Sequence, residues 1–264
     1  MKLKELTIKG FKSIDGEGQQ IRFGDITLLL GANGAGKSNL ISFFRMLGFM
    51  TTGALQQYVG KQGVNQLLFY GPKLTESISF SVTLEDDKNT DCYEVKLSHG
   101  LPDRLFVSGE KVTFHTRGKP KPQEYFLNSG GAETSLAQDG RTTSKVLTSL
   151  LSRINDYQFH DTSDTARIKD RVYVDDANYL RSDAGNLAAF LKNLKDTERF
   201  RPYYQRIVRH IQKVMPQVQD FVLDTLPGNE RYVRLNWQDR LRPDFLFGPD
   251  QISDGSLRFM ALTT

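Results

Sequence analysis

One short loop constrains the fold of this chain more than any other feature. Residues 31–38 read GANGAGKS, a run of mostly small residues that ends in a lysine and a serine. The apolar run Ile26–Leu30 comes directly before the loop, and an apolar stripe at helical spacing follows from Lys37 and is ended by Gly48. A short apolar run bounded by glycines is typical of a strand buried on both faces. We therefore expect a buried strand, a tight loop and then a helix.

The loop matches the pattern GxxxxGK[ST] at every defined position. In that pattern, backbone N–H groups converge on phosphates and the following helix adds its N-terminal dipole. Lys37 would place its ammonium against the β and γ phosphates, and the Ser38 hydroxyl would ligate Mg²⁺. An ordinary glycine-rich turn is the alternative. The candidate nucleotide-binding residues are Gly31, Ala32, Asn33, Gly34, Ala35, Gly36, Lys37, Ser38 and Asn39.

Composition excludes several other classes of protein. The chain has 264 residues, of which 38% are hydrophobic and 25% charged, as in an ordinary globular protein. Ile26–Leu30 is far shorter than the roughly 18 apolar residues of a membrane span, and the charged first ten residues do not resemble a secretory signal. We expect a cytoplasmic protein with no membrane partner. The single cysteine, Cys92, cannot form an intramolecular disulfide, and the four histidines are scattered.

The rest of the chain divides by its periodicity. Alternating residues at 78–84 and 93–97 predict a hairpin, and Leu105–Val107 and Val112–Phe114 predict another pair of strands. Residues 116–145 indicate a loop rich in Gly, Pro and Ser. Later segments predict three helices, a returning pair of strands at 221–223 and 232–235, and a short helix at 257–262. The expected regions are 1–50 (strand, loop and helix), 51–145 (antiparallel β lobe), 146–252 (helical lobe) and 253–264.

Three separated segments resemble one ATPase group. LTIKGFKS at the start, GANGAGKSNL and the late ISDGSLRF are similar to the N-terminal strand, Walker A motif and signature motif of ABC-type ATPases of the RecF, SMC and OLD kind, common among bacterial AAA family ATPases. Leu180–Leu187 also resembles an element of those proteins. The resemblance implies an α/β fold, a P-loop NTPase (ABC-ATPase head) with a mixed core sheet, an antiparallel β subdomain and a helical lobe.

The resemblance also implies an ATP-dependent homodimer. In such families, the signature residues contact the γ-phosphate of ATP on the opposite subunit, which gives that role to Ser253, with Asp254 and Gly255 shaping the turn. A plain N-capped helix is the alternative for Ser253. Lys12, which follows the first strand between Phe11 and Ser13, would touch a phosphate or the ribose; a solvated lysine is its alternative. GTP is disfavoured, because Asn193–Asp196 does not match a guanine-reading NKxD segment.

No counterpart of a Walker B aspartate, catalytic glutamate or switch histidine follows the signature motif, and no Q-loop glutamine can be placed. The Asp175-Asp176 pair precedes the signature, which reverses the family order, and is interpreted as surface or lobe-joining. We therefore expect the N-terminal part of a head, with no catalytic residue assigned and slow or undetectable hydrolysis by this chain alone.

The expected function is ATP-dependent dimerisation coupled to DNA processing, in DNA repair or antiphage defence. The basic run Lys192–Lys213, with interleaved aromatics, is a candidate DNA contact; a solvated helix face is its alternative. Two rival functions stay open. One is a nucleotide-gated module that regulates an effector protein, a toxin or nuclease, with little turnover. The other is a P-loop kinase or monomeric NTPase with a chance match at Ser253.

Overall fold

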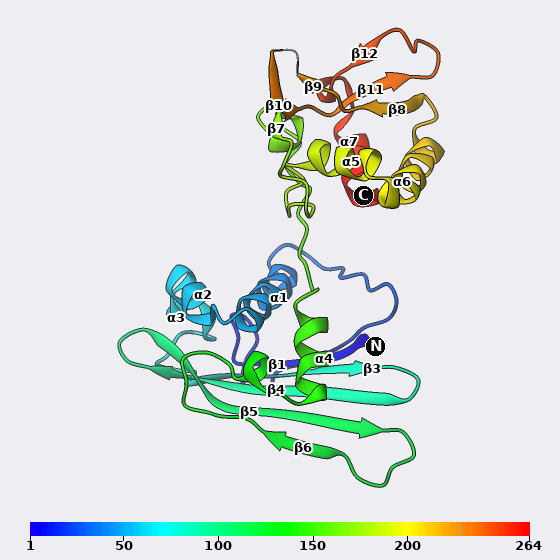
Figure 1. The fold of residues 1–264 in the computed structure, drawn as a ribbon. Helices are drawn as coiled ribbons and strands as arrows, with labels where there is room; N and C mark the ends of the chain where they lie inside the picture. The colour runs from blue at the N-terminus through cyan, green and yellow to red at the C-terminus, as the bar shows by residue number, and fades with distance from the viewer. Residues whose placement is uncertain (227) are drawn as a thin grey trace. The chain divides into compact units, whose positions relative to one another are not determined.

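The computed structural model describes residues 1–226 and 228–264 and divides into two compact units, Met1–Asn155 and Asp156–Thr264. Figure 1 shows both units. The division lies ten residues beyond the point at which the sequence suggested that a helical lobe begins, because the helix at 142–151 packs in the first unit.

Unit 1 is built on a six-stranded antiparallel sheet in the order β2-β1-β3-β4-β5-β6. Neighbouring strands pair along the sheet, with one register shift between β1 and β3 and one between β4 and β5, and only β2 and β6 have a free edge within this sheet. The strands are β1 (Lys2–Lys9), β2 (Gln19–Arg22), β3 (Ser77–Glu85), β4 (Asn89–Gly100), β5 (Arg104–Thr116) and β6 (Gln123–Phe126). The predicted hairpin at 78–97 is confirmed as β3 and β4.

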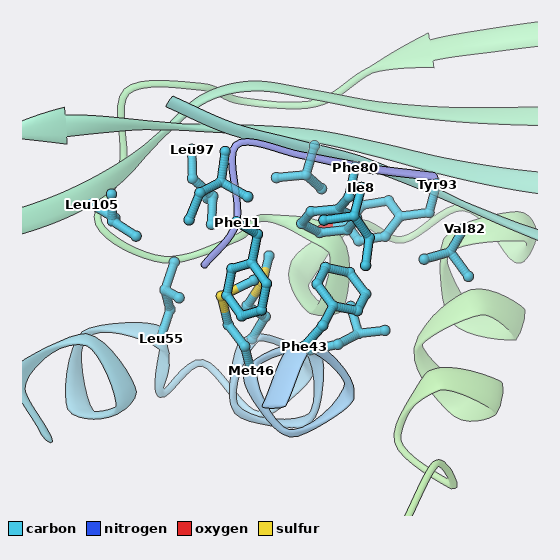
Figure 2. Close-up of a cluster of buried hydrophobic side chains, with 14 of the residues drawn as sticks. Ile8, Phe11, Phe43, Met46, Leu55, Phe80, Val82, Tyr93, Leu97 and Leu105 are labelled. Carbon is cyan, nitrogen blue, oxygen red and sulfur yellow. The ribbon is translucent and has the colours of Figure 1, made fainter. Parts of the chain in front are cut away.

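The helices of unit 1 lie on one face of this sheet (Figure 1). They are α1 (Lys37–Thr51), α2 (Leu55–Gln62), α3 (Val64–Leu67) and α4 (Thr142–Leu151), with a single 3-10 turn, η1 (Leu136–Gln138). Alternate residues of β3 face the helices, and Phe80 meets the ring of Phe43 edge-on at 5.0 Å (Figure 2). The period of two along the strands and the helical stripe of α1 thus bury one shared core.

Two of the sequence-based expectations for the sheet were wrong. Leu105–Val107 and Val112–Phe114 are not a pair of strands but parts of one strand, β5, with an extra residue at Ser108. Odd-numbered residues of β5 face the core before this bulge, and even-numbered residues face it afterwards. The shift interrupts the alternation of apolar residues in the sequence, which therefore looks like the end of one strand and the start of another. The expected loop 116–145 also contains β6 and the start of α4.

The end of the first helix also differs from the expectation. Helix α1 does not end at Gly48 but continues to Thr51.

The expected buried strand at Ile26–Leu30 is the largest correction. Residues 26–30 form no strand, and Ile26, Leu28 and Leu30 are 85%, 78% and 88% exposed. A strand buried on both faces needs a hydrogen-bonded neighbour, and none of the described residues pairs with this segment. Every strand pairing in the described chain is antiparallel. The expected mixed core sheet is therefore not found among the described residues.

In the described residues of unit 2, three helices and two small antiparallel sheets surround a second core. The helices are α5 (Leu187–Asp196), α6 (Arg201–Val214) and α7 (Asp254–Thr263), with the 3-10 turns η2 (Arg167–Lys169), η3 (Glu198–Phe200) and η4 (Pro249–Gln251). One sheet has the order β7-β10-β9, from β7 (Val172–Tyr173), β9 (Thr225–Leu226) and β10 (Asn229–Val233). The other has the order β12-β11-β8, from β8 (Val218–Val222), β11 (Asn236–Asp239) and β12 (Leu246–Phe247).

The helices of unit 2 follow the apolar stripes of the sequence. In α6, Tyr204, Ile207, Val208 and Ile211 are buried, and Pro202 lies in the first turn, where its missing N–H costs nothing. The three predicted helices and the short helix at 257–262 are confirmed as α4, α5, α6 and α7. Throughout the described ranges, no helix is both long enough and apolar enough to span a membrane.

Candidate functional site

The loop Gly31–Ser38 leads into the N-terminus of α1 and leaves that helix end open. Gly36 is the N-cap residue, no side chain caps the helix, and no acidic residue lies in the first turn. Gly34 and Gly36 have φ values of 85° and 87°, which residues with a Cβ rarely adopt. Because the first N–H groups of a helix have no acceptor within it, this end presents donors and a partial positive charge to an anion.

Lys37 lies across the loop that precedes it. Its Nζ donates hydrogen bonds to the carbonyl oxygens of Gly31, at 2.6 Å, and Ala32, at 2.7 Å. These contacts hold the ammonium beside the open helix end, where Ser38 is also exposed. The structure therefore brings the cation, the hydroxyl and a helix N-terminus without a side-chain cap to one place.

The turn after β1 supports this loop from the side. The Asn39 Nδ2 donates to the Ser13 Oγ at 2.6 Å, and a Cβ added to Gly36 would lie 3.2 Å from the same oxygen. Phe11 is fully buried and meets the Phe43 ring edge-on at 5.8 Å, which anchors the turn against α1. Ser13 lies in the GFKS segment that the family resemblance places near a nucleotide, but the sequence did not predict its contact with Asn39.

Lys12 occupies the same turn, but its side chain has different neighbours. The residue has a φ of 51°, and its Nζ lies 5.8 Å from the centre of the Phe11 ring. Burial, together with the nearby charge of Arg45, lowers the pKa of the Lys12 ammonium. The structure thus brings Ser13 into contact with the loop and places the Lys12 ammonium beside Phe11.

The signature segment forms the N-terminus of α7 in unit 2. Ser253 is the N-cap: its Oγ accepts a hydrogen bond from the Ser256 backbone N–H at 3.3 Å and donates to the Ser256 Oγ at 2.8 Å. Ser253, Asp254 and Gly255 are all exposed, and a Cβ added to Gly255 would meet nothing within 4 Å. Leu257, Met260 and Ala261 anchor the helix in the core, so its N-terminal turn faces outward.

The acidic pair Asp175-Asp176 belongs to a structural turn. The Asp176 carboxylate lies 2.7 Å from the Arg181 guanidinium. The fully buried Asn186 donates to the carbonyl oxygens of Asp176 and Tyr179, each at 2.8 Å, and accepts from the Arg181 N–H. The segment 180–187 that resembles the family thus folds around one buried amide. Outside the single undescribed residue, 227, no group of three or more His, Cys, Asp or Glu side chains could hold a metal ion.

Comparison with known proteins places the chain in a family. The AAA domain family model matches residues 5–221. An SMC head solved with the C-winged helix domain of ScpA is 14% identical, with a TM-score of 0.52, covering 100% of this chain and 75% of that one. The SMC head domain from Thermotoga maritima is 17% identical, with a TM-score of 0.41 and coverage of 100% and 71%. No curated protein matches.

The chain therefore belongs to the AAA domain family, and its fold is that of an SMC head.

Proposed function

We propose that this protein binds Mg-ATP and dimerises through it. The observation that carries the proposal is the N-terminus of α1, which no side chain caps and beside which the Lys37 ammonium lies. Residues Gly31 to Asn39 would surround the phosphates, and Ser38 would provide a ligand for Mg²⁺. Lys12 would contact the nucleotide from the neighbouring turn.

The signature turn would supply the second half of the site in a partner copy. Ser253 and Gly255 lie at an exposed helix N-terminus, which is suited to an anion presented by another molecule. Two copies would then close over two ATP molecules, each bound by the loop of one subunit and the signature turn of the other. Exchange of ATP for a shorter phosphate chain would remove the contact to Ser253 and open the dimer.

Ser253→Arg tests this arrangement directly. The bulky cation should block close approach of a second subunit while leaving the loop in unit 1 untouched. We expect the variant to bind Mg-ATP as the wild type does, by calorimetry, and to stay monomeric with ATP, by analytical ultracentrifugation. An ATP-dependent dimer of Ser253→Arg would contradict the proposal, as would a wild-type protein that stays monomeric at all ATP concentrations.

Charge on α6 favours DNA as the partner that responds to dimerisation. The stretch 192–213 carries seven basic and two acidic residues, whereas the rest of unit 2 carries nine basic and fourteen acidic ones. Lys192 pairs with Asp196 and Lys195 with Asp220. The other five have no carboxylate within ion-pair distance among the described residues: Arg199, Arg201, Arg206, Arg209 and Lys213.

These five groups lie on the exposed side of α6 and just before it. Arg201, Gln205 and Arg209 line a shallow hollow of about 690 Å³ between α6 and β8. Arg206 lies over the ring of Tyr203, which is 52% exposed. A helix face with uncompensated arginines and an accessible aromatic ring fits a phosphate backbone. DNA repair and antiphage defence are settings in which such a head would act.

The effector-gating alternative differs in one measurable property. If the head regulates a protein effector, α6 has no need to bind DNA. Reversing Arg206 and Arg209 to glutamate should weaken binding to a labelled duplex by more than tenfold at low salt, since each lost phosphate contact reduces the electrostatic part of affinity. The matched control reverses Arg231 and Arg242, exposed arginines outside α6. Equal DNA binding by both double variants would favour the effector alternative.

A further inference from the structure

The position of Ser253 depends on the short turn directly before it. The turn η4 ends at Gln251, whose side-chain oxygen accepts a hydrogen bond from the Gly248 N–H at 2.9 Å. Ile252 follows and is only 6% exposed. One residue thus separates η4 from Ser253, and that residue is fixed in the core. Whatever holds η4 therefore also sets the direction in which the exposed signature turn points.

Arg234, just after β10, holds η4 from a distant part of the sequence. Its Nη2 donates to the Asp250 carboxylate at 2.5 Å, and its Nε donates to the carbonyl oxygen of Lys169 at 3.1 Å. Lys169 is 6% exposed and lies in η2. A guanidinium is planar and rigid, so two partners on different nitrogens fix both its position and its orientation. Arg234 therefore ties η4 to η2 through one side chain.

The Arg234–Asp250 ion pair is exposed, so we expect it to order the turn η4 more than it stabilises the folded protein. The side chains of Arg234 and Asp250 are 38% and 55% exposed. Ion pairs this accessible to water add little to the free energy of folding. Their main effect is to restrict where the two partners lie, and here one partner is in the turn that leads into Ser253.

We infer that Arg234 is a positioning residue for Ser253. It holds η4 against η2 so that, through the buried Ile252, the turn Ser253–Gly255 projects in the orientation that ATP on a second copy requires. The inference rests on the proposed dimerisation. It adds a residue 19 positions before Ser253 that neither the loop nor the signature motif contains.

The test measures dimer affinity in the full chain with saturating Mg-ATP, by analytical ultracentrifugation. Arg234→Ala should weaken the dimer by about tenfold, the effect of losing one charge-assisted hydrogen bond that orders the turn. The dimer affinity of Arg234→Lys should lie between those of the wild type and Arg234→Ala. An ammonium keeps the charge but does not reproduce the planar geometry with which the guanidinium contacts two partners. Affinity for Mg-ATP should be unchanged, since the loop belongs to unit 1. Arg242→Ala, an exposed arginine without a carboxylate partner among described residues, is the matched control.

Combined variants distinguish the inference from a general loss of stability. Asp250→Ala should also weaken the dimer, and the double variant should be no weaker than Arg234→Ala, because the link from Arg234 to η4 is lost in all three variants. Additive losses, or losses that follow a falling urea midpoint across the set, would overturn the inference. So would an Arg234→Ala dimer as tight as the wild type in a protein whose Ser253→Arg variant is monomeric. If Ser253→Arg itself dimerises, the proposed function fails first.

Discussion

The N-termini of α1 and α7 are the two helix ends in this protein that we assign to phosphate, and they are prepared in opposite ways. At α1, glycine occupies the cap and no side chain satisfies the first backbone donors. At α7, Ser253 already satisfies the Ser256 N–H and bonds its hydroxyl. No side chain caps the first end, whereas the Ser253 side chain caps one backbone donor of the second. This difference suits a site that binds nucleotide first in one subunit and engages the second subunit afterwards.

The largest effect should come from the α1 end. Lys37→Ala removes the only side-chain cation that touches the loop in the described structure. We expect Mg-ATP affinity to fall by at least about 100-fold, as expected when a charged hydrogen-bonding group is lost from a phosphate site. Calorimetry on wild type and variant measures this. If Lys37→Ala binds Mg-ATP normally, the α1 end is not the nucleotide site, and the contrast with α7 loses its meaning.

A smaller effect should come from the turn that supports the α1 end. Ser13→Ala removes the acceptor of the Asn39 amide, and Asn39→Ala removes the donor. Each should weaken Mg-ATP binding by about fivefold, with the double variant no worse than the single ones, because they break one hydrogen bond. Ser79→Ala, on the opposite face of the sheet, is a control. Independent, additive losses would show that Ser13 and Asn39 act separately.

The α7 end should respond in the opposite direction. Ser256→Ala removes the oxygen that accepts the Ser253 hydroxyl and leaves the backbone N–H cap in place. The freed hydroxyl should then strengthen the ATP-dependent dimer by about threefold, the value of one neutral hydrogen bond. Sedimentation at several protein concentrations measures this change. A weaker dimer would mean that Ser256 supports the engaged state, and α7 would then resemble α1.

The smallest effect on either helix end should come from Asp91 in the sheet of unit 1. Burial, with the neighbouring charge of Asp86, raises the pKa of the Asp91 carboxyl to about 6. The folded state therefore holds this proton more tightly than the unfolded state, so the contribution of Asp91 to stability is largest below about pH 4 and falls as the pH rises to about 6.

Asp91→Asn should remove this pH dependence. At pH 7.5 it should raise the free energy of unfolding of unit 1 by about 1 to 2 kcal/mol, with no gain at pH 4, as measured by urea titration. Mg-ATP affinity should stay within twofold of the wild type. A change in affinity as large as that of Ser13→Ala would show that the loop responds to general stability, and it would weaken the case for local support by the turn.

Local patterns predicted much of this structure, and the failures have definite causes. The strands β3 and β4 and the helices of unit 2 follow directly from their periodicity. Ile26–Leu30 has the composition of a buried strand, but composition does not specify a pairing partner, and none is found among the described residues. The bulge at Ser108 hid the continuity of β5, because a single inserted residue reverses the alternation.

Part of the candidate site could likewise be predicted from the sequence, and part could not. The loop 31–38 is contiguous, so its residues could be assigned from spacing alone. The contacts of Ser13 and Arg234 could not, because each joins segments far apart in the chain: Ser13 meets Asn39, and Arg234 meets Asp250 and Lys169. Only the folded chain shows that Ser13 contacts the first turn of α1 and that Arg234 contacts the turn before α7.

The bonds that Lys37 makes to its own loop have a consequence for ligand choice. The Lys37 ammonium donates to the carbonyl oxygens of Gly31 and Ala32. An anion must break these hydrogen bonds before it can accept hydrogen bonds from the ammonium. A monophosphate reaching only the helix end replaces few of those bonds, whereas a longer phosphate chain can meet the helix end and the lysine together. For the proposed nucleotide site, these bonds would favour ligands with a longer phosphate chain, and AMP should compete poorly even at concentrations that are saturating for ATP.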